Sequence, residues 1–350
     1  MFLADDKKVY VATYKEIILI FIAFSVVLFV LYPKNLLKEQ ILQDTSNNDL
    51  NMVYLQNMLK QDPSNESLIL LIANNNYKAG KLMASYGLLK PLMSSTNPEI
   101  RKNASLLSYK LAKERYYVVK DEQQKAQIKD DLRDIFKNIV DNVYYSKENL
   151  NEFYNESFFL GMTSYTFRLL KEKISYAPND IKLLTDAYYL ADKLDYGPEV
   201  INYLDTLQTK DIDNRDNWIL AEYNYYMKKD NLKDAEELLK AHAQNSFKWG
   251  EKLAEFYLAT ESYQAASQTY MQLYDRSNAS NDKKRYFIEA LKSLQAGSLM
   301  KEAVALGYRY ENLYLKDTQV RVFLLKLYLA ANDLKKANDL SKKILTQKIK

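Results

Sequence analysis

An alanine that returns once every thirty-odd residues constrains the fold of this chain more than any other feature. Four segments of the C-terminal half place a large apolar residue three positions before such an alanine. The alanines are Ala235, Ala266, Ala303 and Ala337, at intervals of 31, 37 and 34 residues, and the large residues before them are Leu232, Tyr263, Met300 and Leu334. A unit this short cannot bury its apolar face alone, so such units stack against their neighbours. The repeat therefore predicts a solenoid.

The composition and the apolar spacing predict that the stacked units are helical. The 350 residues include 7 Gly and 6 Pro, too few for the frequent turns that an all-β fold requires. Each alanine segment follows a stretch with apolar residues at i, i+3, i+4 and i+7, which places them on one helix face. Leu253, Ala254 and Tyr257 share one face of a first helix, and Ala266 and Tyr270 share one face of a second. We therefore expect an all-α chain.

The unit at 247–280 resembles the tetratricopeptide repeat (TPR), a helix–turn–helix unit of 34 residues. The unit at 318–350 keeps the same pattern, whereas the unit at 216–246 has Tyr223 where the pattern has a small residue. Small residues let two helix backbones approach closely, and large neighbours fill the flanking grooves. The residues that the resemblance assigns to repeat packing are Leu232, Ala235, Leu253, Ala254, Tyr257, Tyr263, Ala266, Tyr270, Met300, Ala303, Leu324, Tyr328, Leu334 and Ala337.

Prolines indicate the junctions between units. TPR units favour a proline between them, and Pro63, Pro98 and Pro178 stand at such places, where the missing N–H of proline suits the first turn of a helix. We expect a helical connector at 34–62, a TPR-like unit at 63–98, degenerate helical repeats at 99–177 and a TPR array at 178–350. The resemblance is carried by residues 65–98 and 179–350, and continuity alone extends it to the remainder.

An uncharged apolar segment near the N-terminus predicts a single membrane-spanning helix over 15–33. Between Glu16 and Lys34 lie 17 residues without charge, and 13 of them are Ile, Leu, Phe or Val. Insertion of these side chains into a bilayer is favourable by roughly 4–8 kcal/mol. The run is apolar on every side, unlike a buried helix of a soluble domain, and no small-residue cleavage site follows it. We therefore expect an anchor that is not cleaved, preceded by a short cytoplasmic tail, residues 1–14.

The lysines on either side of this segment favour one orientation. Three lysines (Lys7, Lys8, Lys15) precede the apolar segment and two (Lys34, Lys38) follow it closely. Positive charge favours the cytoplasmic side. This weak bias predicts a single-pass protein of a bacterial inner membrane with its N-terminus in the cytoplasm and its repeats in the periplasm.

The sequence contains little of what catalysis or metal binding requires. His242 is the one histidine and there is no cysteine, so a metal site or a catalytic triad would lack partners. No glycine-rich phosphate loop occurs, and a net charge of +4 without a basic stripe disfavours nucleic acid as a partner. We expect His242 to be structural and the chain to be neither an enzyme nor a cofactor carrier.

Thirty tyrosines permit two interpretations. Four Tyr–Tyr doublets begin at Tyr116, Tyr144, Tyr188 and Tyr225, and adjacent residues of a helix point about 100° apart, so only one of each doublet faces the helix-pair core. The other packs between repeats or lies in a binding groove, where a tyrosine offers an apolar face and a polar tip. The TPR resemblance implies that a concave binding face is lined by Asn217, Asn224, Met227, Glu255, Lys292 and Lys326.

These features together predict a membrane-anchored TPR scaffold that binds protein partners in a cell-envelope assembly or export machine. The segment at 296–345, which begins "AGSLMKEAVALGYRY" and follows an N-terminal anchor, also resembles the periplasmic repeat region of the PelB family of exopolysaccharide export proteins. That resemblance implies a role in polysaccharide export. Two alternatives stay open, a cytoplasm-facing membrane adaptor that recruits a soluble partner and a solenoid that binds polysaccharide.

Overall fold

The computed structural model of the chain describes residues 14–31 and 48–347, and these residues form α-helices and two short 3-10 helices with no strand. The prediction of an all-α chain is therefore confirmed for this part of the protein. The helices fall into two compact units, one ending at Lys173 and the other beginning at Ile174. Each unit is described by itself.

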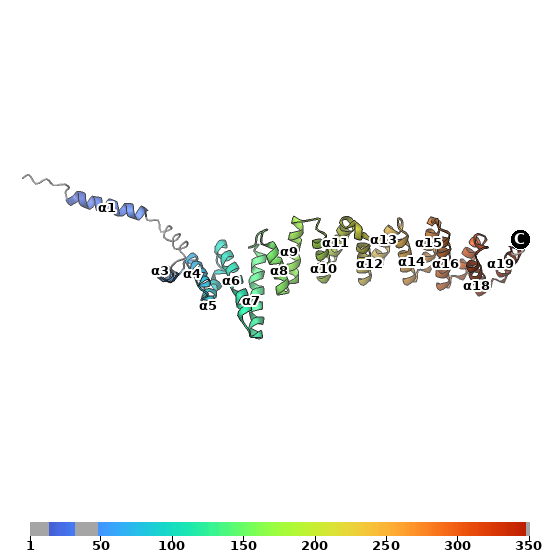
Figure 1. The fold of residues 1–350 in the computed structure, drawn as a ribbon, viewed down its shortest axis with the longest axis horizontal. Coiled ribbons are helices and arrows are strands. Elements are labelled where there is room, and N and C mark those ends of the chain that lie inside the picture. Colours follow the sequence, from blue (N-terminus) through green and yellow to red (C-terminus); the bar gives the residue numbers. More distant parts are fainter. Residues whose placement is uncertain (1–13, 32–47, 348–350) are drawn as a thin grey trace, which may run out of the picture. The chain divides into compact units, whose positions relative to one another are not determined.

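The N-terminal unit is a succession of helices, and those from α3 onward follow one another closely along the chain (Figure 1). They are α1 (Tyr14–Leu31), α3 (Asn48–Gln61), α4 (Glu66–Lys78), α5 (Leu82–Leu92), α6 (Pro98–Val118), α7 (Glu122–Asp141), α8 (Leu150–Leu160) and α9 (Thr163–Tyr176), whose last residues belong to the second unit. Pro98 occupies the first turn of α6, and the Asn97 side chain accepts hydrogen bonds from the backbone N–H groups of Glu99 and Ile100. These are the N–H groups that a helix leaves without internal partners.

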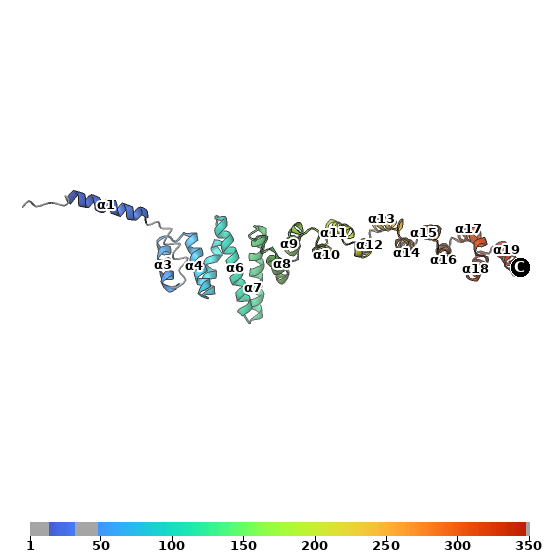
Figure 2. The same ribbon diagram turned by 45° about the horizontal axis from the view of Figure 1, so that its top comes forward.

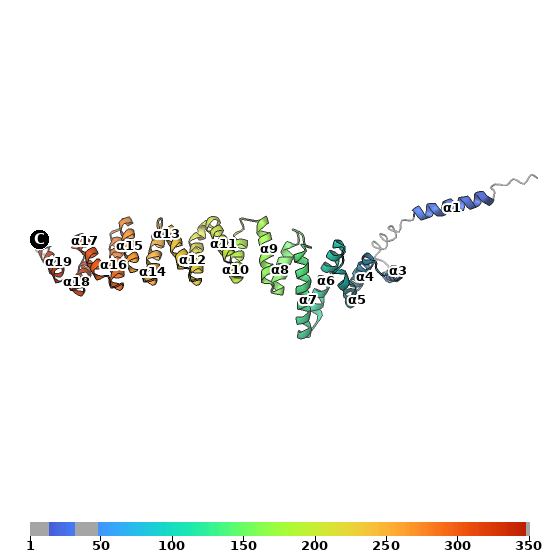
Figure 3. The same ribbon diagram turned by 180° about the vertical axis from the view of Figure 1, so that it is seen from behind.

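The C-terminal unit repeats one helix pair with few variations, and the same succession is visible from behind (Figure 3). Its elements are α10 (Ile181–Lys193), α11 (Gly197–Lys210), η1 (Ile212–Asn214), α12 (Arg215–Lys228), α13 (Leu232–Ala243), α14 (Phe247–Ala259), α15 (Tyr263–Arg276), α16 (Ser280–Ala296), α17 (Met300–Tyr310), η2 (Glu311–Tyr314), α18 (Thr318–Ala330) and α19 (Leu334–Gln347). Within this unit, even-numbered helices lie in one row and odd-numbered helices in another (Figure 2). Helix pairs of this length and order make the unit a TPR-like stack.

Each pair turns at one residue with a left-handed backbone. The residues are Asp195, Asp230, Glu261, Ser298 and Asn332, with φ between 55° and 59°, and each stands two positions before the second helix of its pair. The next residue donates its backbone N–H to a carbonyl five positions earlier, as from Ser262 to Tyr257 at 2.8 Å. This Schellman closure gives partners to carbonyls that the end of the first helix leaves free. The turn thereby fixes how each second helix folds back on the first.

The structure buries the repeated alanines. Ala235, Ala266 and Ala303 are completely buried and Ala337 nearly so, each against the neighbouring helices of its pair. Their short side chains leave the space into which large neighbours such as Tyr257, Leu273 and Tyr328 pack. The other residues assigned to repeat packing that lie in these cores are Leu253, Ala254, Tyr270 and Leu324.

The large residue three positions before each alanine does not share that burial. Leu232 is 40% exposed and Leu334 64% exposed, while Tyr263 and Met300 are partly buried. All four are the first residue of a second helix, directly after the turn. A helical side chain leans toward the N-terminal end of its own helix, so Leu232 and Leu334 lie over the turn, whereas Met300 packs against the core cluster. The packing residue of the motif is thus the alanine.

The described part of the predicted anchor is the helix α1. No helix among the described residues combines the length and the apolar character that crossing a membrane requires. The predicted tail lies outside the described residues apart from Tyr14, as do residues 32–47 of the expected span and connector. The membrane span and the domain boundaries given above therefore remain predictions.

Candidate functional site

A continuous hollow follows three helices of the N-terminal unit, α4, α6 and α8. Its first section, of about 680 Å³, lies between α4 and α6, and its second, of about 440 Å³, lies between α6 and α8. The two sections meet at Leu106 and Lys110, which line both. We call the combined hollow the α4–α6–α8 groove. Within this unit, α4, α6 and α8 are the first helices of successive pairs, the position that lines the inner face in TPR-like stacks.

The first section is mostly apolar. Its walls are Ser67, Leu70, Leu71 and Asn74 from α4, and Glu99, Asn103, Leu106, Leu107 and Lys110 from α6. On each helix these residues recur at intervals of three or four, so each set forms one stripe along its helix. Leu70, Leu106 and Leu107 are only partly buried in spite of their size. The section therefore offers an apolar surface that the chain's own side chains do not fully cover.

The second section combines charged and aromatic side chains. Its walls are Leu106, Tyr109, Lys110, Lys113, Glu114 and Tyr117 from α6, Asn149 directly before α8, and Glu152, Phe153 and Glu156 from α8. Tyr117 is 65% exposed, and its ring stacks at 6.4 Å on the ring of Phe159. The exposed Tyr117 ring, which lies against the partly buried Phe159, gives this end of the groove an apolar surface with a hydroxyl at its edge.

Hydrogen bonds from tyrosines to glutamates fix the walls of the groove. Tyr109 Oη donates to Glu156 Oε2 at 2.7 Å, and Lys113 pairs with the other oxygen of the same carboxylate. Tyr77 Oη donates to Glu114, and Lys110 Nζ lies 5.1 Å from the centroid of the Tyr77 ring. Burial, and then the neighbouring glutamate, raise the pKa of both tyrosines, so each hydroxyl stays protonated and remains a donor. Each contact joins one first helix to the next.

The net charge of the groove is negative. Four glutamates and two lysines line its two sections. Glu114 and Glu156 accept bonds from Tyr77 and Tyr109, whereas no described side chain pairs with Glu99 or Glu152. A ligand that carries positive charge next to an apolar group would complement such a surface.

Sequence reasoning did not single out this groove, although one signal was present. Residues 68–72 are five consecutive apolar residues, Leu-Ile-Leu-Leu-Ile. A helix that contacts one partner needs an apolar stripe of about 100°, and five consecutive apolar residues exceed it. Leu68, Leu71 and Ile72 are buried in the core, and the surplus residue Leu70 lines the groove. A helix whose apolar residues cover more than one stripe of its surface is therefore the sequence feature that predicts such a groove.

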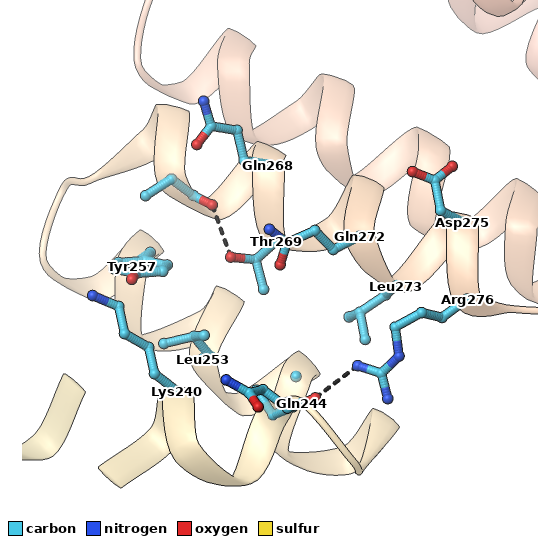
Figure 4. Close-up of a pocket in the computed structure, with 13 residues that line it drawn as sticks. Lys240, Gln244, Leu253, Tyr257, Gln268, Thr269, Gln272, Leu273, Asp275 and Arg276 are labelled. Carbon is cyan, nitrogen blue, oxygen red and sulfur yellow. Dashed lines mark hydrogen bonds between the residues drawn. The ribbon is translucent and has the colours of Figure 1, made fainter. Parts of the chain in front are cut away.

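A second hollow, of about 640 Å³, lies in the C-terminal unit among α13, α14 and α15 (Figure 4). Its floor includes Gly250, Leu253 and Leu273, where a Cβ added to Gly250 would come within 2.5 Å of Leu273 Cδ2. Its rim is polar, with Gln244, Gln268, Gln272 and Lys240. Arg276 Nη1 donates to the Ala243 carbonyl at 2.7 Å, so this guanidinium is occupied in joining α15 to α13.

The residues predicted to line a concave face lie on the first helices of the C-terminal unit. Asn217, Asn224 and Met227 are on α12, Glu255 on α14, Lys292 on α16 and Lys326 on α18. All are exposed except Met227, which is partly buried. Lys252 donates to Glu255 at 3.3 Å, and Lys292 donates to Glu289 at 2.7 Å. None of the six lines a hollow described above, and their role in binding stays a prediction.

Many tyrosines link neighbouring repeats through carboxylates. Tyr286 Oη of α16 donates to Glu251 Oε1 of α14 at 2.6 Å, and Arg285 contacts the same oxygen at 2.7 Å. Trp249 Nε1 repeats the arrangement one pair earlier, donating to Asp216 Oδ1 at 2.9 Å. The interpretation of tyrosines as packing between repeats thus accounts for Tyr77, Tyr109 and Tyr286, while the exposed ring of Tyr117 fits the groove interpretation.

One doublet departs from the expectation that only one of two adjacent tyrosines faces a core. Tyr144 and Tyr145 are both buried. Both follow the end of α7, outside any helix, so the helical offset of about 100° does not apply to them. Tyr144 Oη accepts a bond from Arg101 Nε at 2.7 Å, and Tyr145 Oη donates to Glu172 Oε2 at 2.7 Å.

The single histidine lies in a packing position. The His242 ring on α13 is partly buried, with its centroid 6.0 Å from that of Trp249. Burial and, to a smaller extent, the nearby Arg215 lower the pKa of His242, which favours the neutral ring.

No protein-family model and no curated protein matches the chain. Among solved structures, it is similar to a chain of Naa15/Naa10 bound to HypK-THB, with 11% identity and a TM-score of 0.36 over 83% of this chain and 43% of that one. It is similar to the P58(IPK) TPR domain, with 12% identity and a TM-score of 0.25 over 88% and 90% of the two chains. A third is the human IFIT1 dimer with PPP-AAAA, with 13% identity and a TM-score of 0.23 over 88% and 70%. The chain thus spans less than half the length of the first of these.

Proposed function

We propose that the chain is a scaffold that binds a segment of a partner protein in the α4–α6–α8 groove. The observation that supports this proposal is the uncovered apolar surface between α4 and α6, continuous with an acidic and aromatic section between α6 and α8. The helices that form it are held by buried leucines and by the tyrosine–glutamate bonds, so the groove exists before a ligand arrives. Preformed surfaces bind with less loss of conformational entropy.

The chemistry of the groove specifies the partner segment. A large apolar side chain would cover Leu70, Leu106 and Leu107, because burying their exposed area is favourable by about 25 cal/mol per Å². A neighbouring Lys or Arg would reach Glu99 or Glu152, the two carboxylates without a described partner. The partner segment is thus apolar and basic.

Leu106→Glu should abolish the binding of such a segment. Leu106 lines both sections, so a carboxylate there breaks the apolar surface and adds charge to an already acidic wall. Random short peptides displayed on phage and selected on the full chain in mild detergent should converge on sequences with an apolar residue beside Lys or Arg. Their affinity for Leu106→Glu should fall at least about tenfold, or 1.4 kcal/mol.

Met83→Glu supplies the matched control for this experiment. Met83 is an exposed apolar residue of the same unit on α5, a second helix, and lines neither section of the groove. Selected peptides should bind this variant with unchanged affinity. Selection without any convergent sequence, or equal loss of binding in both variants, would exclude the groove as the binding site.

We further propose that α1 tethers this scaffold to a membrane. All its large apolar residues between Ile17 and Val27 are exposed, so no described helix of the chain covers them. A helix that is apolar on every side is stable where its surroundings are apolar as well. The lysine bias of the flanking sequence supports a periplasmic repeat region, and the alternative is an adaptor that faces the cytoplasm.

Reporter fusions after Lys350 distinguish the two orientations of the tether. With the repeats in the periplasm, alkaline phosphatase fused there should be active, and a fluorescent protein that matures only in the cytoplasm should stay dark. Fluorescence without phosphatase activity would instead establish the adaptor. A chain found wholly in the soluble fraction after lysis would refute the tether itself.

A second candidate function is polysaccharide binding, in line with the resemblance to the PelB family. The observation that favours it is the exposed ring of Tyr117, held against Phe159, because sugar rings pack on exposed aromatic faces. If the groove holds a polymer, Tyr117→Ala should weaken retention of anionic or amino-sugar polymers on the immobilised full chain several-fold, with helicity unchanged by circular dichroism. The exposed Tyr189→Ala serves as a control, and equal retention by all three proteins would rule out this candidate.

A further inference from the structure

The last helix pair described, α18–α19, carries an uncovered face whose counterpart is covered in the pair α14–α15, two repeats earlier. The pairs α14–α15 and α18–α19 correspond at a constant offset of 71 residues, which aligns Ala266 with Ala337 and Tyr257 with Tyr328. The same offset aligns Glu251 with Val322, Leu258 with Leu329, and Tyr274 with Leu345. The first pair therefore serves as a template for what the second pair contacts.

In the template, the three corresponding residues face the next helix pair. Glu251 accepts hydrogen bonds from Arg285 and Tyr286 of α16. The ring of Tyr274 lies 6.4 Å from that of Phe287 on α16 and 5.3 Å from that of Tyr310 on α17. Leu258 packs against the cluster that contains Phe287. A helix thus covers this face in the template.

In α18–α19 the corresponding face is apolar and exposed. Val322 is 47%, Leu329 52% and Leu345 61% exposed. Val322, Leu325 and Leu329 are spaced i, i+3 and i+7, so they form a stripe along α18. Both helices stand at the far end of their unit from α10 (Figure 1), and no described helix follows them.

Unpaired lysines surround this apolar face. Lys326 is one turn from Val322 on α18, and Lys335 and Lys342 lie two turns apart on one stripe of α19. All three are exposed, and no described carboxylate pairs with them. Of the acidic side chains nearby, Asp333 bonds to Lys336 and Glu311 to Lys343, and Asp339, one turn from both Lys335 and Lys342, is the one described carboxylate against these three lysines. We call Val322, Leu329, Leu345 and these three lysines the end face.

We infer that the end face docks an acidic amphipathic helix of another protein. The template favours a helix, because α16 occupies the corresponding place against α14 and α15. In the template, Arg285 of α16 bonds to Glu251. The residue that corresponds to Glu251 in α18 is Val322, so a helix docked there needs an apolar side chain at the place where α16 has Arg285. The three lysines require carboxylates beside the apolar stripe of the docked helix.

The charge of the end face disfavours a second copy of the chain as its occupant. Residues 316–346 carry seven Lys or Arg and three Asp. Two such faces placed together would bring like charges into contact, which is unfavourable across an interface. The inference concerns the C-terminal unit and does not depend on the α4–α6–α8 groove.

A labelled synthetic helix tests the inference on the full chain held in amphipol. The probe carries leucines at i and i+4 with glutamates beside them, and a matched peptide carries lysines instead. We expect the fluorescence anisotropy of the acidic probe to rise on binding, the rise to weaken with added salt, and the lysine peptide to stay free. Leu329→Glu should weaken binding of the acidic probe about tenfold. Leu313→Glu, at an exposed leucine outside the end face, should leave it unchanged.

Three results would overturn the inference. The first is equal binding of the acidic probe and the lysine peptide. The second is an affinity of Leu329→Glu for the acidic probe that equals that of the unchanged chain. The third is a chain that binds phosphatidylglycerol vesicles but not the acidic probe. A dimer that Leu329→Glu dissociates would overturn it in favour of a second copy. Fluorescence of Trp218 and Trp249, both in the C-terminal unit, verifies that each variant is folded.

Discussion

Phe287→Ala should lower the free energy of unfolding of the C-terminal unit by about 3–5 kcal/mol. Phe287 is completely buried on α16 and joins three neighbouring elements. Its ring stacks on Tyr314 of η2 at 5.2 Å and contacts Tyr310 of α17 at 5.6 Å and Tyr274 of α15 at 6.4 Å. Truncation would leave a cavity that three rigid rings cannot fill by small shifts. The loss would therefore reach the upper part of the range for a buried aromatic residue.

Intrinsic fluorescence measures this effect in one unit. Both tryptophans, Trp218 and Trp249, lie in the C-terminal unit, so their emission during urea denaturation reports on that unit. Leu313→Ala, at an exposed leucine of η2, should change the free energy of unfolding by less than about 0.5 kcal/mol. If Phe287→Ala changed the free energy of unfolding no more than the control does, the aromatic cluster around Phe287 would not hold the repeats together.

Ala266→Leu should destabilise the same unit by about 1–3 kcal/mol although it adds apolar surface. Ala266 is completely buried between α14 and α15, in the cluster that includes Leu253 and Tyr257. A leucine there would force the two helices apart, because close approach requires the short side chain. The destabilisation would arise from volume alone, since leucine and alanine have similar helix propensities.

Ala241→Leu is the matched control for this substitution. Ala241 is an exposed alanine on α13, another second helix, so the same added side chain meets solvent there. Urea denaturation should show a change within about 0.5 kcal/mol. An Ala266→Leu chain as stable as the Ala241→Leu chain would mean that the recurring alanine has no role in spacing the helices.

The helices and their buried alanines could be predicted from the sequence because both depend on local spacing. An alanine such as Ala235 returns at a nearly constant interval, and its neighbours show a helical apolar period. The same reasoning misplaced Leu232 and Leu334, because spacing indicates which face a residue shares but not where the turn ends. Both residues follow that turn directly.

The turns themselves could not be predicted, for a physical reason. No single functional group is common to Asp195, Glu261 and Ser298, since two are carboxylates and one is a hydroxyl, yet each adopts the same left-handed backbone. The left-handed turn is stabilised by the backbone hydrogen bonds that close the helix end, and any non-proline residue can supply the N–H group for them. Gly80, at the corresponding turn between α4 and α5, and Gly161, at the turn between α8 and α9, are the glycines that this conformation favours.

The groove depends on contacts between residues far apart in the sequence. Tyr109 and Glu156 are separated by 47 residues, and Tyr77 and Glu114 by 37, intervals without any constant period. With 30 tyrosines and 45 acidic residues, the sequence does not indicate which of them pair. The fold is needed to bring α4, α6 and α8 side by side, and only then does the surplus of leucines become a surface.

Hydrogen exchange of the full chain, measured by mass spectrometry with and without a selected peptide, tests the proposed scaffold most directly. The peptide should slow amide exchange in α4, α6 and α8, the helices that line the groove, because a bound segment suppresses their local opening. Exchange from α10 to α19 should not change. Slower exchange confined to α12, α14, α16 and α18, where the predicted concave residues lie, or no change anywhere, would contradict the proposal.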